Sequence, residues 1–465
     1  MAGVTRDNPF LDYYGDSGFN WSFYAEVTLM DTMTSKLRAL ALAEPVLVVG
    51  MGASGHVALD LLREAGYDAI GLDERLEERR IEKRNFDDPQ AFAGAGTLVV
   101  SPGVDRRRAA FAASFAQQIN DVELFARLND KPVLAVTGSN GKSTVVTLLA
   151  KSLQYAGFKA KLCGNIGRPV LDALFDPEEA DCYVIELSSY QLELCPSLYP
   201  RVGAVLNITP DHLDRYDSFA DYAAAKGNLV RQSSICILNG EDDECAKLAG
   251  EGQNIIFYGT AATLPNRVSD GKIYLHNQLV LDTERLRLSG SHNFSNVLCV
   301  LLMLEAFGVR PQQVLPALET FAGLPHRMQT VAEENGVRWI NDSKATNIGA
   351  AAASLAGLKN PVILIAGGVG KNQDFSLLAQ VIQASTVRQV LLIGVDNRDM
   401  MTAFDAVKIA YENCGTLDKA VARARELAQS GDCVLLAPAT ASFDQFNGYD
   451  ARGNAFAYEV TSTCR

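Results

Sequence analysis

The sequence predicts an α/β protein built from three consecutive domains, each with a parallel sheet covered by helices. Its 465 residues are enough for about three domains of ordinary size. Short apolar runs, which predict buried strands, alternate with stretches of helical pattern along most of the chain. Glycine-rich turns follow several of these runs, as expected where a strand of a parallel sheet leads into a helix.

Composition excludes several classes of protein. A formal net charge of −13 argues against nucleic-acid binding, so sites for anionic substrates must be locally basic. The nine cysteines are odd in number and include no Cys-x-x-Cys pair, which is typical of reduced thiols in a cytoplasmic protein. No apolar stretch approaches the roughly 18 residues of a membrane helix, and the N-terminus lacks a signal pattern, so we expect no membrane insertion.

Residues 1–44 differ from the rest of the chain. Turn-forming residues punctuate this segment, and its aromatic residues follow no sustained period. We expect a poorly ordered extension or a segment that docks on the body, and Met33 is an alternative start. The predicted domains are residues 45–130, 131–325 and 326–465.

A phosphate-binding turn is the strongest motif. An apolar run at 132–137 leads through a glycine turn into a helical pattern at 145–155, and the turn comprises Gly138, Ser139, Asn140, Gly141, Lys142, Ser143 and Thr144. Lys142 would reach the phosphates of ATP or GTP, and the Ser143 hydroxyl would bind Mg²⁺. The usual P-loop has an earlier glycine where Val136 stands, so the alternative is a plain glycine turn with an exposed lysine. The motif predicts a central P-loop mononucleotide-binding domain.

The first domain carries a second glycine motif. Gly50, Gly52 and Gly55 follow the strand expected at 46–49, and Asp73 stands about 20 residues further on. Alone, this Rossmann-like pattern indicates a dinucleotide and a dehydrogenase, but the same turn suits any pyrophosphate. A glycine turn that only packs a helix on a strand is the alternative. The strand expected at 97–100 ends in Ser101-Pro102-Gly103, which faces the same crevice.

Several polar residues of the second domain allow two interpretations. Glu186 ends an apolar run, where an acid could hold Mg²⁺ or order water. His212 could be a metal ligand or part of a helix cap, and Lys226 could simply be a solvated helix lysine. Asn293 and Asn296 lie three residues apart and so share a helix face, where they could read an adenine edge or cap the helix. Further strands are expected at 204–208, 235–238 and 255–258.

The third domain is also Rossmann-like. Strands are expected at 337–341, 362–366, 390–393 and 433–437, and we expect a parallel sheet from their alternation with helices. Polar groups follow three strand ends, at 342–347, 367–371 and 438–444. Convergent polar groups at the carboxyl ends of strands predict a third site.

Together, the motifs TGSNGKST, GNIG, ELSSYQLE, TPDHLDRY, SHNFSN, LPHR and NDSKATN resemble those of the Mur ligases, which are ATP-dependent amide ligases of cell-wall precursor synthesis. They extend from about Gly50 to Asn454. GMGASG, SPG, Lys-Ser in the P-loop and ASFDQF at 441–446 are similar to members that add D-glutamate to UDP-N-acetylmuramoyl-L-alanine. The Asp-Asn-Pro-Arg motif typical of the member adding the third residue is absent from the last domain.

The resemblance implies residue roles. The UDP substrate would be held by Ala53, Ser54, Asp73, Glu74, Arg75, Ser101, Pro102, Gly103 and Asn165. ATP would be held by the P-loop with Asn293, Asn296, Arg327 and Asp342. Two Mg²⁺ ions would be bound by Ser143, Glu186, His212 and Lys226, the last carried as its carbamate. D-glutamate would be surrounded by Lys344, Thr346, Lys371, Ser442 and Tyr449, where Tyr449 stands at a position that is commonly Phe.

The resemblance also implies a mechanism with an acyl-phosphate intermediate, in which Lys142, Glu186, His212 and Lys226 are catalytic and a hinge near 323–330 moves the last domain. We expect a monomeric, cytoplasmic enzyme. The sequence leaves a dehydrogenase, a P-loop switch or transport ATPase, a folylpolyglutamate-type ligase and another Mur ligase as alternatives.

Overall fold

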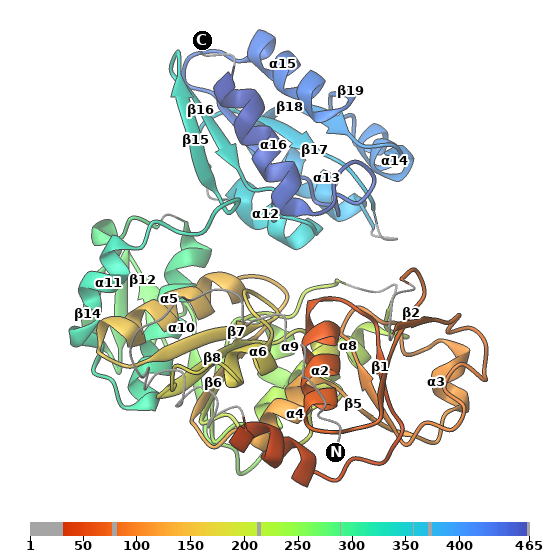
Figure 1. Ribbon diagram of the computed structural model, residues 1–465. Helices are drawn as coiled ribbons and strands as arrows, with labels where there is room; N and C mark the ends of the chain where they lie inside the picture. The colour runs from red at the N-terminus through yellow and green to blue at the C-terminus, as the bar shows by residue number, and fades with distance from the viewer. Residues whose placement is uncertain are drawn as a thin grey trace, which may run out of the picture.

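Three sheets in chain order form the framework of the protein. The structure, a computed structural model, describes residues 31–76, 81–211, 215–288, 290–356, 358–370 and 374–462. The first two domains lie side by side and the third, coloured blue, sits above them (Figure 1). The predicted α/β fold class is confirmed. Each large sheet falls within one predicted segment, and the boundaries at 45–130, 131–325 and 326–465 stay a prediction.

The first sheet is parallel and has the strand order β3-β2-β1-β4-β5. All four residues of its central strand β1 are buried. Its strands are β1 (Val46–Val49), β2 (Ala69–Asp73), β3 (Ile81–Lys83), β4 (Thr97–Val100) and β5 (Gln117–Ile119). Its helices are α2 (Ala53–Glu64), α3 (Ala109–Ala113) and α4 (Asp121–Leu128).

Part of the N-terminal segment docks on this domain. Residues 31–39 are helical, and Leu37 is buried in the same core as β1. The Tyr67 hydroxyl donates to the Leu37 carbonyl oxygen at 3.0 Å. Of the two expectations for residues 1–44, docking therefore describes 31–44, while residues 1–30 lie outside the described residues.

The central sheet is parallel and has the order β11-β10-β9-β6-β8-β7. Its strands are β6 (Val133–Thr137), β7 (Ala160–Gly164), β8 (Cys182–Glu186), β9 (Val202–Val205), β10 (Ile235–Asn239) and β11 (Ile255–Tyr258). Its helices are α5 (Lys142–Tyr155), α6 (Val170–Leu174), α7 (Ser189–Leu192), α8 (Phe219–Gln232), α9 (Asp243–Lys247), α10 (Ser291–Phe307) and α11 (Leu315–Thr320), with 3₁₀ turns at Thr283–Arg285 and Pro311–Gln313. The strand expected at 204–208 is wrong in its limits: the backbone after Val205 turns toward the P-loop, where the Asn207 carbonyl accepts from the Ser139 N–H at 2.9 Å.

Antiparallel pairing was missed in two places. A small sheet of β12 (Arg267–Ser269), β13 (Lys272–Leu275) and β14 (Gln278–Asp282) packs on the central domain. In the third domain, the strands expected from the sequence pair in parallel, and an additional edge strand, β15 (Gln329–Glu334), pairs antiparallel with β16. Asn335-Gly336 joins these two strands with both residues at positive φ, a two-residue turn that favours a hairpin.

The third sheet has the order β15-β16-β20-β17-β18-β19 and is otherwise parallel. Its remaining strands are β16 (Val337–Asn341), β17 (Val362–Ala366), β18 (Val387–Ile393), β19 (Tyr411–Gly415) and β20 (Cys433–Leu436). Its helices are α12 (Ile348–Ala356), α13 (Ser376–Gln383), α14 (Arg398–Ala406), α15 (Leu417–Leu427) and α16 (Tyr449–Ser462). Separate apolar clusters cover its two faces, so the carboxyl ends of the strands are left to carry polar groups.

Two further expectations concern the described residues. All eight cysteines among them are free thiols, and seven of these are buried. Across the described ranges, no helix is both long enough and apolar enough to cross a membrane.

Candidate active site

The P-loop forms the anion cradle that its glycines predict. Gly138 and Gly141 have φ values of 147° and 86°, which side chains rarely adopt. A Cβ on Gly141 would lie 2.8 Å from the side-chain oxygen of Asn296. Gly141 is also the N-cap of α5 and offers no side-chain cap, so the first-turn N–H groups remain available to an anion.

Two lysines converge on one carbonyl oxygen of this loop. Nζ of Lys142 donates to the Gly138 oxygen at 2.7 Å, and Nζ of Lys226 donates to the same oxygen at 2.9 Å. Lys226 is only 2% exposed and lies over the Tyr222 ring, 4.7 Å from its centroid. Burial lowers the pKa of Lys142 and lowers the pKa of Lys226 further, with the charge of Lys142 adding to the second effect. The site therefore favours a neutral amine at Lys226.

Glu186, at the end of β8, has one carboxylate oxygen that accepts no hydrogen bond from the described residues. Oε1 of Glu186 accepts from the Asn165 side chain at 2.8 Å, whereas Oε2 is buried and has no hydrogen-bond partner within the described part of the chain. An unsatisfied buried carboxylate oxygen is a ligand that Mg²⁺ prefers. The buried Ser143 hydroxyl, which accepts from Arg327 at 2.8 Å, is a second oxygen of the right kind. The donor set fits Mg²⁺.

His212 lies outside the described residues. Among those that are described, no group of three or more His, Cys, Asp and Glu side chains is gathered tightly enough to hold a metal.

Asn207 is a P-loop residue that the sequence analysis missed. Its side-chain oxygen accepts from the Asn140 N–H at 2.8 Å, and its side-chain nitrogen donates to the Asn140 carbonyl at 3.0 Å. Ser139 is held in a similar way, because its hydroxyl donates to the Thr209 carbonyl at 3.0 Å and lies 2.8 Å from the Tyr222 hydroxyl. The segment after β9, through Asn207 and Thr209, therefore holds the P-loop in place by hydrogen bonds.

A narrow cavity lies between the P-loop, α10 and the third domain. The ATP residues expected from the sequence that line it are Asn140, Gly141, Thr144, Asn293, Asn296, Arg327 and Asp342, and His292 and Lys344 join them. The amides of Asn293 and Asn296 face each other at 3.5 Å, as their spacing predicts. The cavity holds only about 90 Å³, well below the roughly 300–1,000 Å³ of small-molecule sites. A nucleotide would require the third domain to move away from the P-loop.

The third domain makes direct contact with the P-loop. Besides the bond from Arg327 to Ser143, the Asn347 side-chain nitrogen lies 3.3 Å from the Asn140 side-chain oxygen and 3.1 Å from Asp211. Asp342 is nearly buried and accepts from the Met328 N–H and the Ser354 hydroxyl. Burial raises the pKa of Asp342.

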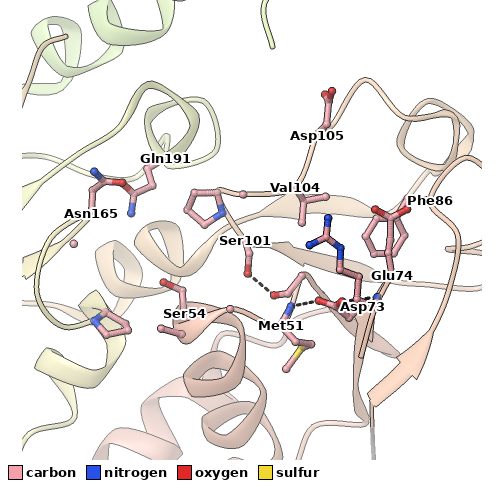
Figure 2. A pocket seen from close by; sticks show the side chains of 18 of the residues that line it. Met51, Ser54, Asp73, Glu74, Phe86, Ser101, Val104, Asp105, Asn165 and Gln191 are labelled. Atoms are coloured by element: carbon pink, nitrogen blue, oxygen red, sulfur yellow. Dashed lines mark hydrogen bonds between the residues drawn. The ribbon is translucent and has the colours of Figure 1, made fainter. Parts of the chain in front are cut away.

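A larger cavity of about 670 Å³ opens between the first two domains. Every residue expected to hold the UDP moiety lines it, namely Ala53, Ser54, Asp73, Glu74, Arg75, Ser101, Pro102, Gly103 and Asn165. Figure 2 shows Asn165 and Gln191 of the central domain facing residues of the first domain across it. Its size suits a nucleotide-sized ligand.

Hydrogen bonds within this cavity shape its turns. The Asp73 carboxylate accepts from the backbone N–H of Met51 at 2.9 Å and of Arg75 at 2.8 Å (Figure 2). Burial opposes the charge of Asp73, but these bonds hold its pKa below the usual value. Asp73 is therefore engaged in bracing the glycine turn. Lining residues that the sequence analysis did not single out include Phe86 and Arg108, which belong to no motif, and Gln191, which lies within the motif ELSSYQLE.

Four of the residues expected around D-glutamate lie in described parts of the third domain, namely Lys344, Thr346, Ser442 and Tyr449. Nζ of Lys344 lies 3.7 Å from the Tyr449 ring centroid, and burial lowers the pKa of Lys344 to about 8. Thr346 adjoins Lys344, its N–H donating to the Lys344 carbonyl at 2.8 Å. Ser442 is buried and follows Ala441, which pairs with Val369 through two backbone bonds. Lys371, two residues beyond Val369, lies outside the described residues.

Arg452 links these loops and was also missed. Its guanidinium donates to the Ser343 hydroxyl and carbonyl at 3.0 and 2.9 Å and to the Thr440 carbonyl at 3.1 Å. Its side chain is 1% exposed, which is rare for an arginine. Arg452 therefore connects the loop that carries Lys344 to the loop that carries Ser442.

Comparison with known proteins gives matches along most of the chain. Residues 136–304 match the family model described as Mur ligase middle domain, and residues 326–440 match that described as Mur ligase, glutamate ligase domain. A UDP-N-acetylmuramoylalanine--D-glutamate ligase of Alcanivorax borkumensis is 40% identical over 438 residues, covering 90% of this chain and 98% of the relative. The ligase of the same name from Escherichia coli is 36% identical over 430 residues, covering 89% and 97%.

Solved structures share the fold. The UDP-N-acetylmuramate-alanine ligase of Thermotoga maritima superposes with a TM-score of 0.59 at 16% identity, over 90% of this chain and 99% of that one. The order of the domains and their parallel sheets is thus found in a distant sequence.

Proposed function

Because this chain belongs to the Mur ligase family, whose members are ATP-dependent ligases that form amide bonds, we propose that it joins D-glutamate to UDP-N-acetylmuramoyl-L-alanine in peptidoglycan precursor synthesis. One observation carries the proposal. Asn165 lines the 670 Å³ cavity and donates to Glu186, the acid beside the P-loop. A substrate whose UDP end fills that cavity would therefore have its other end beside the acid and the phosphate cradle.

The reaction needs ATP because a carboxylate is a poor acceptor of amines. Transfer of the γ-phosphoryl group to the L-alanine carboxylate replaces a poor leaving group with phosphate. The D-glutamate amine then attacks the carbonyl carbon, and the tetrahedral intermediate expels phosphate to leave the amide. Two anions must approach in the first step, so Lys142 and the first-turn N–H groups of α5 stabilise the charge that develops.

Mg²⁺ would be held by Ser143, Glu186, His212 and Lys226, and when bound it would neutralise phosphate charge and align the reacting oxygens. Glu186 has the free oxygen for this role, and Asn165 holds its other oxygen in place. The Arg327–Ser143 bond would have to be exchanged when nucleotide enters, which is consistent with a hinge near 323–330.

Lys226 would act as its carbamate. A neutral Nζ attacks the carbon of CO₂ and releases one proton, which turns a cation into an anion. Burial and the adjacent Lys142 favour the neutral amine that this step requires. Lys226→Ala should be nearly inactive, and formate or acetate should restore part of its activity. Full activity without such an anion would exclude the carbamate as a functional group.

D-glutamate would bind on the third domain, where Lys344 and Lys371 supply cations for its carboxylates. Domain movement would then carry its amine to the acyl phosphate and exclude water from it. We expect a monomeric enzyme in the cytoplasm. The dehydrogenase alternative gains no support, because the Asp73 carboxylate is engaged with backbone N–H groups.

Phosphate release from ATP, measured with UDP-N-acetylmuramoyl-L-alanine and one amino acid at a time, tests the proposal. Release should depend on D-glutamate and on the UDP substrate together. L-glutamate should be a poor substrate, because inversion at the α-carbon prevents the amine and both carboxylates from being placed at once. Equal release with L-alanine or L-lysine would contradict the assignment.

A further inference from the structure

One arginine of the central domain reaches into the first domain. Arg215 lies between β9 and α8, and its guanidinium donates to the carbonyl oxygens of Gly103 at 3.2 Å and Val104 at 2.7 Å. Nε of the same group lies 3.7 Å from the Asp105 carboxylate. Three consecutive residues of a first-domain loop are thus engaged by one side chain from another domain.

That loop is a wall of the UDP cavity. Residues 101–105 all line the 670 Å³ cavity, whereas Arg215 does not and instead approaches the loop elsewhere. Gly103 has no side chain to pack against the domain, and the space beside its Cα is open, because a Cβ built there would meet no atom within 4 Å. Arg215 donates to the carbonyl oxygen of Gly103, which has no side chain of its own to pack, and to that of Val104, which follows it.

Arg215 is itself held in place. Its guanidinium carbon lies 4.6 Å from the centroid of the Tyr190 ring, and Tyr190 stacks on Tyr216 with centroids 5.7 Å apart and planes 8° apart. Its side chain is 19% exposed, so solvent competes only weakly for its donors. A planar guanidinium that packs on an aromatic ring holds its N–H donors in fixed directions. A lysine ammonium cannot reproduce this arrangement.

We propose that Arg215 is a positioning residue that holds the loop at 101–105 against the bound UDP moiety, so that UDP affinity depends on a central-domain side chain outside the UDP cavity. The inference rests on the proposed function, which assigns that cavity to UDP. Arg215 also connects the first and central domains, between which the proposed substrate would extend.

Calorimetric titration with UDP tests the inference on the full chain. Arg215→Met should weaken UDP binding about tenfold or more, because small displacements of a binding loop are costly. Arg215→Lys should lie between that variant and the wild type, since it keeps the charge and loses the fixed donor directions. ADP affinity should be unchanged in both. In turnover, KM for the UDP substrate should rise while KM for ATP stays constant, a split that general loss of stability would not produce.

Arg106→Met is the matched control. Arg106 forms a second ion pair between the described residues of these two domains, 2.8 Å from Glu193, but neither carbonyl of the loop accepts a hydrogen bond from it. UDP affinity in this variant should stay within about twofold of the wild type, as for a partly exposed ion pair.

Two results would overturn the inference and differ in meaning. Unchanged UDP affinity in Arg215→Met, or in Arg215→Lys if the former does not fold, would show that the loop holds its position unaided. Failure of the wild-type protein to bind UDP at all would reject the assigned cavity, and with it the proposed function.

Discussion

Replacement of Lys226 by methionine should stabilise the protein while it abolishes turnover. Lys226 is 2% exposed, and its Nζ donates to a carbonyl oxygen that also accepts from Lys142. The two nitrogens cannot be more than about 6 Å apart, a distance at which like charges disfavour each other. Methionine fills a similar volume without a charge, so the cost of burying an amine disappears.

The magnitude follows from three contributions. Exchange of buried charge for apolar side chain commonly gains about 1–4 kcal/mol. Loss of the bond to Gly138 costs about 1 kcal/mol, and loss of the contact with the Tyr222 ring costs about 0.5–1 kcal/mol. The midpoints of these ranges leave a net gain of about 1 kcal/mol, which should raise the Tm of the central domain by about 2–4 °C.

The gain should depend on pH in a definite direction. Burial holds the pKa of Lys226 well below its ordinary value of 10.5, so the unfolded chain binds the proton more tightly than the folded one. The destabilisation is full below the lowered pKa of the folded state and vanishes as pH rises past 10.5. The advantage of Lys226→Met should therefore shrink as pH is raised from 7 toward 10.5.

Thermal unfolding in nucleotide-free and bicarbonate-free buffer, scanned across that pH range, measures the effect. Lys159→Met replaces an exposed lysine just beyond α5 and should change stability by no more than about 0.5 kcal/mol. A lower Tm for Lys226→Met than for the wild type at pH 7 would refute the reasoning.

Three further substitutions test the division of labour. Lys142→Ala should lower kcat about 10³-fold with an unchanged circular dichroism spectrum, and near-normal turnover would reject the ATP-loop assignment. Asn207→Ala removes both bonds to the Asn140 backbone, each worth about 1 kcal/mol, so KM for ATP should rise about tenfold in steady-state kinetics; an unchanged KM would show that the loop needs no clamp. Lys371→Ala and Ser442→Ala should each raise KM for D-glutamate in the same assay and leave KM for the UDP substrate unchanged, and a collapse of UDP-substrate affinity would contradict separate sites.

The framework of the fold could be predicted because buried parallel strands are short apolar runs, as in β1 and β17. Two of the strands that escaped prediction, β12 and β15, lack such a run and are partly exposed, and only the turns Asp270-Gly271 and Asn335-Gly336 mark them. Both dipeptides are strong hairpin signals that were not used.

The UDP cavity could be predicted residue by residue because its walls are turns at the carboxyl ends of neighbouring strands, which a parallel sheet places together. Asn207, Arg215 and Arg452 could not, because each acts through a contact with a residue distant in sequence. A polar residue in a loop carries no sign of which backbone it will meet.

Transfer of oxygen from substrate to phosphate tests the central claim most directly. UDP-N-acetylmuramoyl-L-alanine labelled with ¹⁸O in the alanine carboxylate would be turned over with ATP and D-glutamate, and the released phosphate examined by mass spectrometry. A reaction through an acyl phosphate places one labelled oxygen in each phosphate released, because the bond from the carbonyl carbon to that oxygen is the one that breaks. Amide product accompanied by phosphate without label would contradict the account.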